Sequence, residues 1–338
     1  MIESIEFHNF KVLRDCTLPL GPCNILVGPN GSGKSTVLQA LTAVREPNNV
    51  RLPQIASVTL RNEAEPEDVR VALNVKHGLV RSVCLMRWDK DGVNTSHVRK
   101  EQAKVVESMP LPQLASVVKQ IRVYSLDAKA IARQATVQPQ IELGADGSKL
   151  AAVLDGLRDT HPDRFDAINQ AIAAWLPEFG AVLFERPEEG HKSIVLESRG
   201  GKYRIPASNL SQGTLLALAI LTLAYLPEPP PLIGLEEPDR GIHPRLLRHV
   251  ADAIHRLSFP QEFGEDREPV QVIATTHSPY FLDLFKDHPE EIIICERTEE
   301  GVRFQKLSER ADINEILAGA PLGEVWYSGV LGGVPAEP

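Results

Sequence analysis

The sequence predicts an α/β protein in which a mixed central sheet is accompanied by an antiparallel β layer and a helical lobe. Alternation of apolar and polar residues between 57 and 88 indicates antiparallel strands, and helical spacing dominates residues 148–226. Three short apolar runs end in glycine or polar residues, which is typical of buried strands whose carboxyl ends carry chemistry. These runs are residues 24–28, 231–235 and 270–274.

The first half of the chain supplies the predicted sheets. Residues 2–10 predict a half-buried strand, because Ile5 and Phe7 share one face. After the run at 24–28, a helix with an apolar face continues until Pro47 ends it. The antiparallel strands follow, with alternation clearest at Val69, Val71, Leu73 and Val75. Residues 89–147 fit no pattern, apart from one strand expected at 121–124.

The second half begins with two helices on either side of Pro162. Two strand-like pieces at 182–185 and 193–197 follow, with Gly200 and Gly201 as a turn. We expect a discontinuous nucleotide-binding lobe and a helical lobe, and no heptad pattern predicts a long coiled-coil arm. The predicted boundaries are 1–147 and 227–338 for the first lobe and 148–226 for the second.

Composition is that of a soluble globular protein, with 43% hydrophobic and 24% charged residues in 338. The net charge of −9 gives no global attraction to nucleic acid or to an anionic membrane, and 5% aromatic residues argues weakly against a base-stacking surface. The four cysteines show no metal-binding spacing, which favours structural thiols in a reducing compartment. No apolar run is long enough for a membrane span. We therefore expect a cytoplasmic protein without membrane contact.

A phosphate-binding loop stands between the first apolar run and the helix that follows. Its pattern is G-x-x-x-x-G-K-S, which predicts a P-loop NTPase that binds ATP with Mg²⁺. Backbone N–H groups of the glycine-rich turn would hold the polyphosphate, Lys34 would reach the β- and γ-phosphates, and Ser35 would contact Mg²⁺. The predicted nucleotide-binding residues are Gly28, Pro29, Asn30, Gly31, Ser32, Gly33, Lys34, Ser35 and Thr36.

A second candidate anion site precedes a nearly all-apolar helix that must be buried. Ser211, Gln212 and Gly213 stand where this helix begins, so a hydroxyl and free N–H groups are available there. Ser211 as a simple N-cap of a core helix is the alternative, and the segment alone does not decide between the two.

Two further strands end in groups suited to nucleotide hydrolysis. Glu236 and Glu237 follow the run at 231–235, so Glu236 would hold Mg²⁺ and Glu237 would polarise the attacking water. His277 follows the run at 270–274, where it would donate to the γ-phosphate or to that water. A solvated acidic turn and a structural histidine are the alternatives, and the shared context favours the functional interpretation.

Together these motifs resemble the Walker A, signature, Walker B and switch-histidine motifs of ABC-type ATPases. Within that class the chain is most similar to RecF/SMC-like and OLD-family ATPase domains, in a stand-alone form without a Toprim domain. The opening Ile5-Glu-Phe-His-Asn-Phe-Lys, the Glu-Glu-Pro motif, Gly-Ile-His-Pro and Thr-His-Ser-Pro carry the likeness. The segment from Leu322 also resembles the end of stand-alone bacterial ATPases of this group.

The resemblance implies a head-to-tail homodimer, formed on ATP binding or constitutively. Each ATP would lie between residues 28–36 of one copy and 211–213 of the other, with the loop at 239–243 crossing the interface. The resemblance also implies a switch in DNA maintenance or anti-phage defence, with an effector protein and DNA as possible partners. Gln212, Thr214 and Glu236 depart from the transporter form of the motifs. No Q-loop glutamine is assigned among Gln134, Gln138 and Gln140.

Other function classes fit the sequence less well. An OLD-type nuclease would need a metal-binding domain after His277, and residues 278–338 contain no Asp-x-Asp pair. The Glu-Glu-Pro-Asp-Arg run differs from that of a transporter subunit, and no Asn-Lys-x-Asp motif indicates a GTPase. An ATP-binding scaffold subunit with little hydrolysis is the remaining alternative. Scattered arginines and lysines are read as solvated surface charge rather than as a DNA site.

Overall fold

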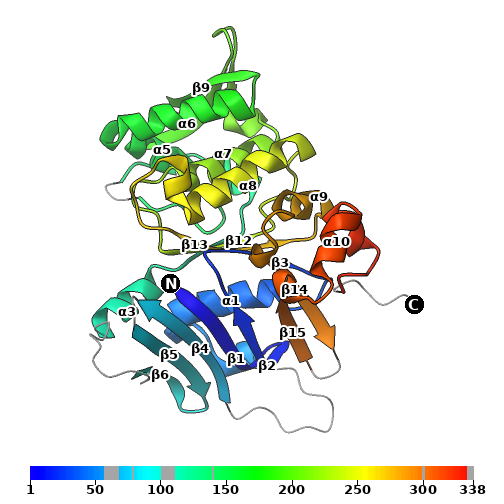
Figure 1. Ribbon diagram of the computed structural model, residues 1–338. Coiled ribbons are helices and arrows are strands. Elements are labelled where there is room, and N and C mark those ends of the chain that lie inside the picture. Colours follow the sequence, from blue (N-terminus) through cyan, green and yellow to red (C-terminus); the bar gives the residue numbers. More distant parts are fainter. Residues whose placement is uncertain (57–67, 78–79, 100–110, 139–140, 299–300, 333–338) are drawn as a thin grey trace. The chain divides into compact units, whose positions relative to one another are not determined.

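A computed structural model of the chain gives its fold. It describes residues 1–56, 68–77, 80–99, 111–138, 141–298 and 301–332 (Figure 1). The chain divides into two compact units by its contacts. Unit 1 contains Met1–Val123, Pro230–Gly234 and Arg267–Pro338, and unit 2 contains Tyr124–Pro229 and Leu235–Asp266. The boundaries between these units differ from the lobe boundaries expected at residues 147 and 226. The division into a nucleotide-binding lobe and a helical lobe stays a prediction.

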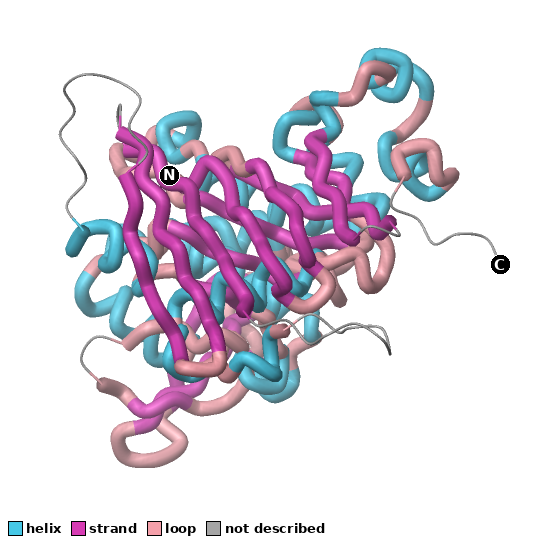
Figure 2. The backbone as a smooth tube through the Cα atoms, turned by 90° about the horizontal axis from the view of Figure 1, so that it is seen from below, coloured by secondary structure: helices cyan, strands magenta, loops and turns pink. Residues whose placement is uncertain are grey.

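Unit 1 contains an antiparallel sheet of five strands, which lie side by side in Figure 2. The strands alternate between buried and exposed residues, as the sequence predicts for this layer; Val69, Val71, Leu73 and Val75 are all buried. In sheet order they are β2 (Leu13–Pro19), β1 (Ile2–Phe10), β4 (Asp68–His77), β5 (Val80–Asp89) and β6 (Gly92–Arg99).

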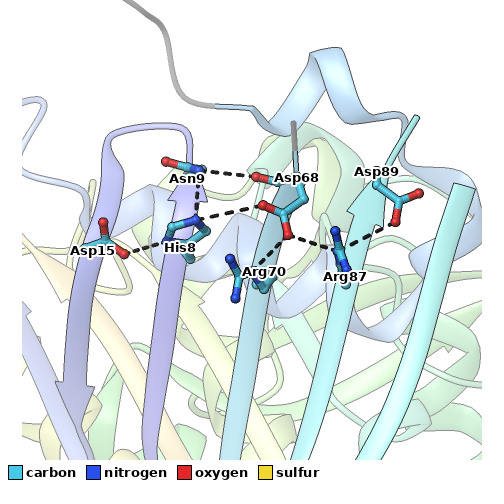
Figure 3. Close-up of polar contacts among 7 residues, drawn as sticks. All are labelled: His8, Asn9, Asp15, Asp68, Arg70, Arg87 and Asp89. Atoms are coloured by element: carbon cyan, nitrogen blue, oxygen red, sulfur yellow. Dashed lines mark hydrogen bonds and ion pairs between the residues drawn. The ribbon is translucent and has the colours of Figure 1, made fainter. Parts of the chain in front are cut away.

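The outward side of this sheet carries a network of ion pairs (Figure 3). Arg70 and Arg87 stand directly opposite each other on β4 and β5, an arrangement that repels like charges. Asp68 offsets the repulsion, because its Oδ2 lies 2.9 Å from the Nε of each arginine. In the same network Nδ1 of His8 lies 2.5 Å from Oδ1 of Asp15. Paired charges therefore stabilise the face that apolar packing does not cover.

The central sheet has six strands and is mixed, as predicted. Strand β3 pairs in parallel with β13 on one side and β14 on the other, while β15 is antiparallel to β14. The residues of β3, β13 and β14 that are in register with one another are buried, as the apolar runs indicate. The order is β15 (Gly301–Lys306), β14 (Ile292–Thr298), β3 (Cys23–Val27), β13 (Gln271–Thr276), β12 (Leu232–Glu236) and β7 (Arg122–Tyr124).

One continuous apolar cluster joins the two sheets of unit 1 through helix α1 (Lys34–Arg45). Leu38, Leu41 and Val44 of this helix pack with Ile5 of the antiparallel sheet and Leu26 of the central sheet. The remaining helices of unit 1 are short. They are η1 (Pro47–Asn49), α2 (Leu52–Ile55), α3 (Leu111–Lys119), α9 (Pro279–Leu282), η4 (Asp283–Phe285), η5 (Pro289–Glu291), η6 (Leu307–Glu309), α10 (Ile313–Gly319) and α11 (Leu322–Tyr327).

Unit 2 is dominated by helices around α7, whose residues from Thr214 to Ala224 are all buried. Strand β10 pairs with β8, β9 and β11, so a small antiparallel sheet completes the unit. The elements are α4 (Ala128–Ile131), β8 (Ala135–Thr136), α5 (Leu150–Thr160), α6 (Pro162–Trp175), β9 (Phe179–Glu185), β10 (His191–Ser198), β11 (Arg204–Pro206), η2 (Ala207–Asn209), α7 (Gln212–Ala224), α8 (Pro244–Ser258) and η3 (Pro260–Phe263).

The poorly patterned stretch at 89–147 contains elements that the sequence did not predict, namely β6, α3, α4 and β8. Part of the antiparallel region expected at 57–88 and the candidate Gln140 lie outside the described residues. Among the residues that are described, no helix combines the length and apolar character that crossing a bilayer requires.

Candidate functional site

The phosphate loop lies at the carboxyl end of a central strand, which is where open α/β sheets bind their ligands. It follows the carboxyl end of β3, which is the strand between β13 and β14 in the sheet. Val27, the last residue of β3, is in register with Thr276 on one side and with Ile294 on the other. The loop therefore emerges between the carboxyl ends of two neighbouring parallel strands and leads directly into α1.

Lys34 is held inside this loop. Its ammonium group donates to the carbonyl oxygens of Gly28 at 2.7 Å and Pro29 at 2.8 Å, and Ser32 Oγ lies 3.4 Å away. The side chain is only 4% exposed. A buried cation with carbonyl partners is positioned for an anion that the loop encloses, because a phosphate offers stronger acceptors than neutral carbonyls.

The loop leaves no room for a side chain at its first glycine. A Cβ atom placed on Gly28 would lie 2.2 Å from the carbonyl oxygen of Cys295 and 2.8 Å from Ser32 Oγ. The opposite side of the loop is open, since Asn30, Gly31 and Ser35 are exposed. The buried side thus fixes the backbone against β14, while the exposed side presents N–H groups and the Ser35 hydroxyl to a ligand.

His277 begins the segment that leaves β13, one residue after the Thr276 that is in register with Val27. The imidazole is exposed, whereas the six strand residues before it are buried. The next residue, Ser278, caps the short helix α9 by accepting from the Phe281 N–H at 3.2 Å. In unit 1, the phosphate loop and His277 therefore follow adjacent strands, and both begin at the same position along the sheet.

Unit 2 holds the second candidate anion site at the start of α7. Ser211 is the N-cap of this helix, because its Oγ accepts from the Thr214 N–H at 3.1 Å. Gly213 packs against the loop that follows β12: a Cβ atom on it would lie 2.7 Å from the Gly241 carbonyl oxygen. A Cβ atom on Gly241 would in turn lie 3.0 Å from the Gln212 side chain. The structure thus gives Ser211 its capping role, while phosphate binding by residues 211–213 stays a prediction.

The paired carboxylates lie at the end of β12, whose last residues belong to unit 2. Both Glu236 and Glu237 are partly exposed. Glu237 adopts φ 44°, a left-handed conformation that costs a residue with a side chain about 1–2 kcal/mol. Its carbonyl accepts from the Arg240 N–H at 3.0 Å, and its Oε2 lies 3.7 Å from Arg240 Nη1. Backbone strain at this position is typical of functional turns.

The residues present suit Mg²⁺ and a nucleotide. Within unit 1, Ser35 offers an exposed hydroxyl in the first turn of α1, and hard cations prefer such oxygen ligands. Gly28 makes room for the loop, and Lys34 supplies the positive charge. The Q-loop glutamine stays unassigned among Gln134, Gln138 and Gln140.

Sequence reasoning missed the contribution of β14. The carbonyl of Cys295 limits the space beside Gly28, and the Arg297 side chain approaches Gly31. Burial raises the pKa of the Cys295 thiol to about 12, so this cysteine is a neutral packing residue beside the loop. The signal was available: residues 292–295 form a further apolar run that ends in charged residues, as β12 does.

Known families cover most of the chain. The family described as "AAA ATPase domain" matches residues 1–105. The family described as "AAA domain, putative AbiEii toxin, Type IV TA system" matches residues 116–283. An OLD nuclease from Thermus scotoductus is 23% identical over 333 residues, which include 84% of this chain. The match spans 60% of the length of that nuclease.

Solved structures share the fold. An SMC head bound to the C-terminal winged-helix domain of ScpA superposes with a TM-score of 0.62 at 17% identity, over 90% of this chain and 96% of that one. The SMC head domain from Thermotoga maritima gives a TM-score of 0.50 at 15% identity, over 90% and 98%. With the P-loop between parallel strands and the two AAA matches, these findings confirm the resemblance of the chain to the ABC-type ATPases of the RecF/SMC-like and OLD-family group.

Proposed function

We propose that the protein binds ATP at residues 28–36 and hydrolyses it with the help of Mg²⁺. The observation that carries this proposal is the phosphate loop itself, in which the buried Lys34 ammonium is held by the Gly28 and Pro29 carbonyls. The arrival of His277 from the neighbouring strand at the level of Val27 adds support. Lys34 would then exchange its carbonyl partners for phosphate oxygens.

Each proposed catalytic residue has a distinct task. Glu237 accepts a proton from the attacking water, His277 donates a hydrogen bond to the γ-phosphate or to that water, and Lys34 stabilises charge on the transferred phosphoryl group. Ser35 and Glu236 would hold Mg²⁺, which neutralises charge on the β- and γ-phosphates when it is bound. The strained backbone of Glu237 supports its role, since strained residues cluster at active sites and ligand-binding turns.

ATP would also join two copies of the chain head to tail. Ser211, Gln212 and Gly213 of one copy would contact the γ-phosphate held by the phosphate loop of the other. Exposure of Ser211 and Gln212 at the start of α7 supports this role, because a second molecule can reach them. A ligand that binds both copies stabilises the dimer, and its hydrolysis releases it.

The dimer switch would act through a partner. The OLD nuclease relative and the family description that names a toxin of a type IV system favour anti-phage defence, and the SMC-like fold is compatible with DNA maintenance. An effector protein is the expected partner, and DNA is a possible one. An ATP-binding scaffold with little hydrolysis is the second candidate, favoured if turnover is undetectable under all partner conditions.

The solution mass of Glu237→Gln, measured by light scattering with and without Mg-ATP, tests this proposal. The variant should bind ATP without turnover and therefore shift from monomer to dimer. Ser211→Arg, added to it, should prevent the shift by placing a bulky cation at the interface. Glu228→Gln and Ser208→Arg are matched controls, because both residues are exposed in unit 2 and have no proposed role. The controls should hydrolyse ATP at the normal rate.

Three outcomes separate the parts of the proposal. Failure of the normal chain to bind ATP refutes it entirely. ATP binding with hydrolysis that Glu237→Gln does not reduce refutes the assigned base. An unchanged mass despite binding refutes an ATP-gated dimer, and the search would then move to co-purifying proteins.

A further inference from the structure

Strand β14 runs alongside the strand that delivers the phosphate loop. The two are parallel, with Ile294 in register with Val27, so β14 continues past the end of β3, next to the loop, while it stays paired with β15. Its residues from Ile292 to Cys295 are buried, whereas Glu296 and Arg297 are exposed. The first charged side chains of this strand therefore stand at the level where the loop begins.

Alternation along β14 decides which of these charges faces the loop. Ile293 and Cys295 belong to the apolar cluster that includes helix α1, and Arg297 follows them on the same side. Val302 of β15 is directly opposite Arg297 in register and shares that side. Its Cγ1 would lie 3.4 Å from a Cβ atom on Gly33, which confirms that this side of the β14–β15 hairpin covers the loop.

The guanidinium reaches the exposed part of the loop. Nη1 of Arg297 lies 3.6 Å from the position that a Cβ atom on Gly31 would occupy. Gly31 is exposed, and so is the arginine side chain. Lys34, by contrast, is buried within the loop. The loop therefore has one buried cation within it and one exposed cation beside it.

We propose that Arg297 is a further ligand of the phosphate chain of the nucleotide, and this inference rests on the proposed ATP binding. A guanidinium offers several donors in a fixed plane and pairs bidentately with phosphate oxygens, which a lysine ammonium cannot do. Arg297 would move by side-chain rotation alone, because the hairpin that carries it is packed on Gly33. Lys34 and Arg297 then neutralise the polyphosphate from two directions.

Arg303 provides a matched control. It lies on β15 opposite Glu296, so it has the same charge and exposure but points to the other side of the hairpin. The test measures the affinity of a fluorescent ATP analogue for the normal chain and for Arg297→Ala, Arg297→Lys, Arg303→Ala and Lys34→Ala. Unlabelled ATP, ADP and inorganic tripolyphosphate serve as competitors. Thermal unfolding of each variant without nucleotide verifies its fold.

We expect Arg297→Ala to weaken ATP, ADP and tripolyphosphate by a similar factor of about 10, the usual effect of losing a hydrogen bond to a charged group. Arg297→Lys should recover part of the loss, and Arg303→Ala should bind normally. Affinity of the normal chain should also fall more steeply with salt than that of Arg297→Ala.

The failures are distinguishable. Equal binding by Arg297→Ala and Arg303→Ala, with binding lost in Lys34→Ala, overturns the role of Arg297 and leaves ATP binding intact. A loss for ATP and ADP without a loss for tripolyphosphate assigns the arginine to the base or ribose and also overturns the inference. Absence of binding by the normal chain removes the proposed function and the inference with it.

Discussion

Gly28→Ala tests whether the phosphate loop depends on its contact with β14. The added methyl group would lie 2.2 Å from the Cys295 carbonyl oxygen, where ordinary contacts begin at 3.4 Å. Relief requires a backbone displacement of about 1 Å, and overpacking of this kind costs roughly 1–3 kcal/mol. Neither side can yield easily, since Cys295 is fully buried and Val27 is paired on both sides. We therefore expect lower stability and a displaced loop that no longer holds ATP.

Gly156→Ala makes the same substitution where it should have the opposite effect. Gly156 lies within α5, and a Cβ atom there meets no atom within 4 Å. Alanine should stabilise the protein by about 0.5–1 kcal/mol, because glycine is a poor helix former. Urea unfolding and titration with an ATP analogue measure both variants. Normal stability and ATP affinity in Gly28→Ala would refute the proposed close approach.

Three other changes have defined outcomes. Asp68→Asn leaves two arginines opposed on the antiparallel sheet, so it should lower the free energy of unfolding by about 1 kcal/mol in urea titrations; an unchanged midpoint would contradict the role of the ion pairs. Ser211→Ala removes the cap that accepts from the Thr214 N–H and should cost about 1 kcal/mol in the same assay, with no loss contradicting the capping geometry. Burial raises the pKa of Cys295 from 9.0 to about 12. The folded chain retains this proton while the unfolded chain loses it above about pH 9, so stability should fall between about pH 9 and pH 12. Cys295→Ala should reduce that fall in urea midpoints, and an identical pH profile would contradict it.

The sequence predicted the parts of the fold that depend on periodicity and glycine placement. The phosphate loop, the strands at residues 24, 231 and 270 and the helix after Pro162 all carry local signals, and the structure has elements there. Strand β6 and helix α3 were missed, because their sequences combine charged and apolar residues without a clear period. Residues of β6 form a strand because they pair with β5.

The site was predictable only as far as motifs describe it. Lys34 and His277 belong to recognisable patterns, but Arg297 does not, because its approach to Gly31 follows from the order of strands in the sheet. Strand order is a long-range property that no local pattern contains. The N-cap role of Ser211 was one of two interpretations that the sequence left open, and only the contact with Thr214 established it.

Close packing between Gly213 and the Gly241 carbonyl constrains how the protein can change over evolutionary time. The 2.7 Å approach excludes any side chain at position 213 unless the backbone at position 241 is rerouted. Gly241 itself adopts φ 75°, so few residues can replace it independently. These two positions should therefore change together or not at all. Among diverging relatives, a chain that retains one glycine and loses the other would have had to rebuild the whole turn after β12.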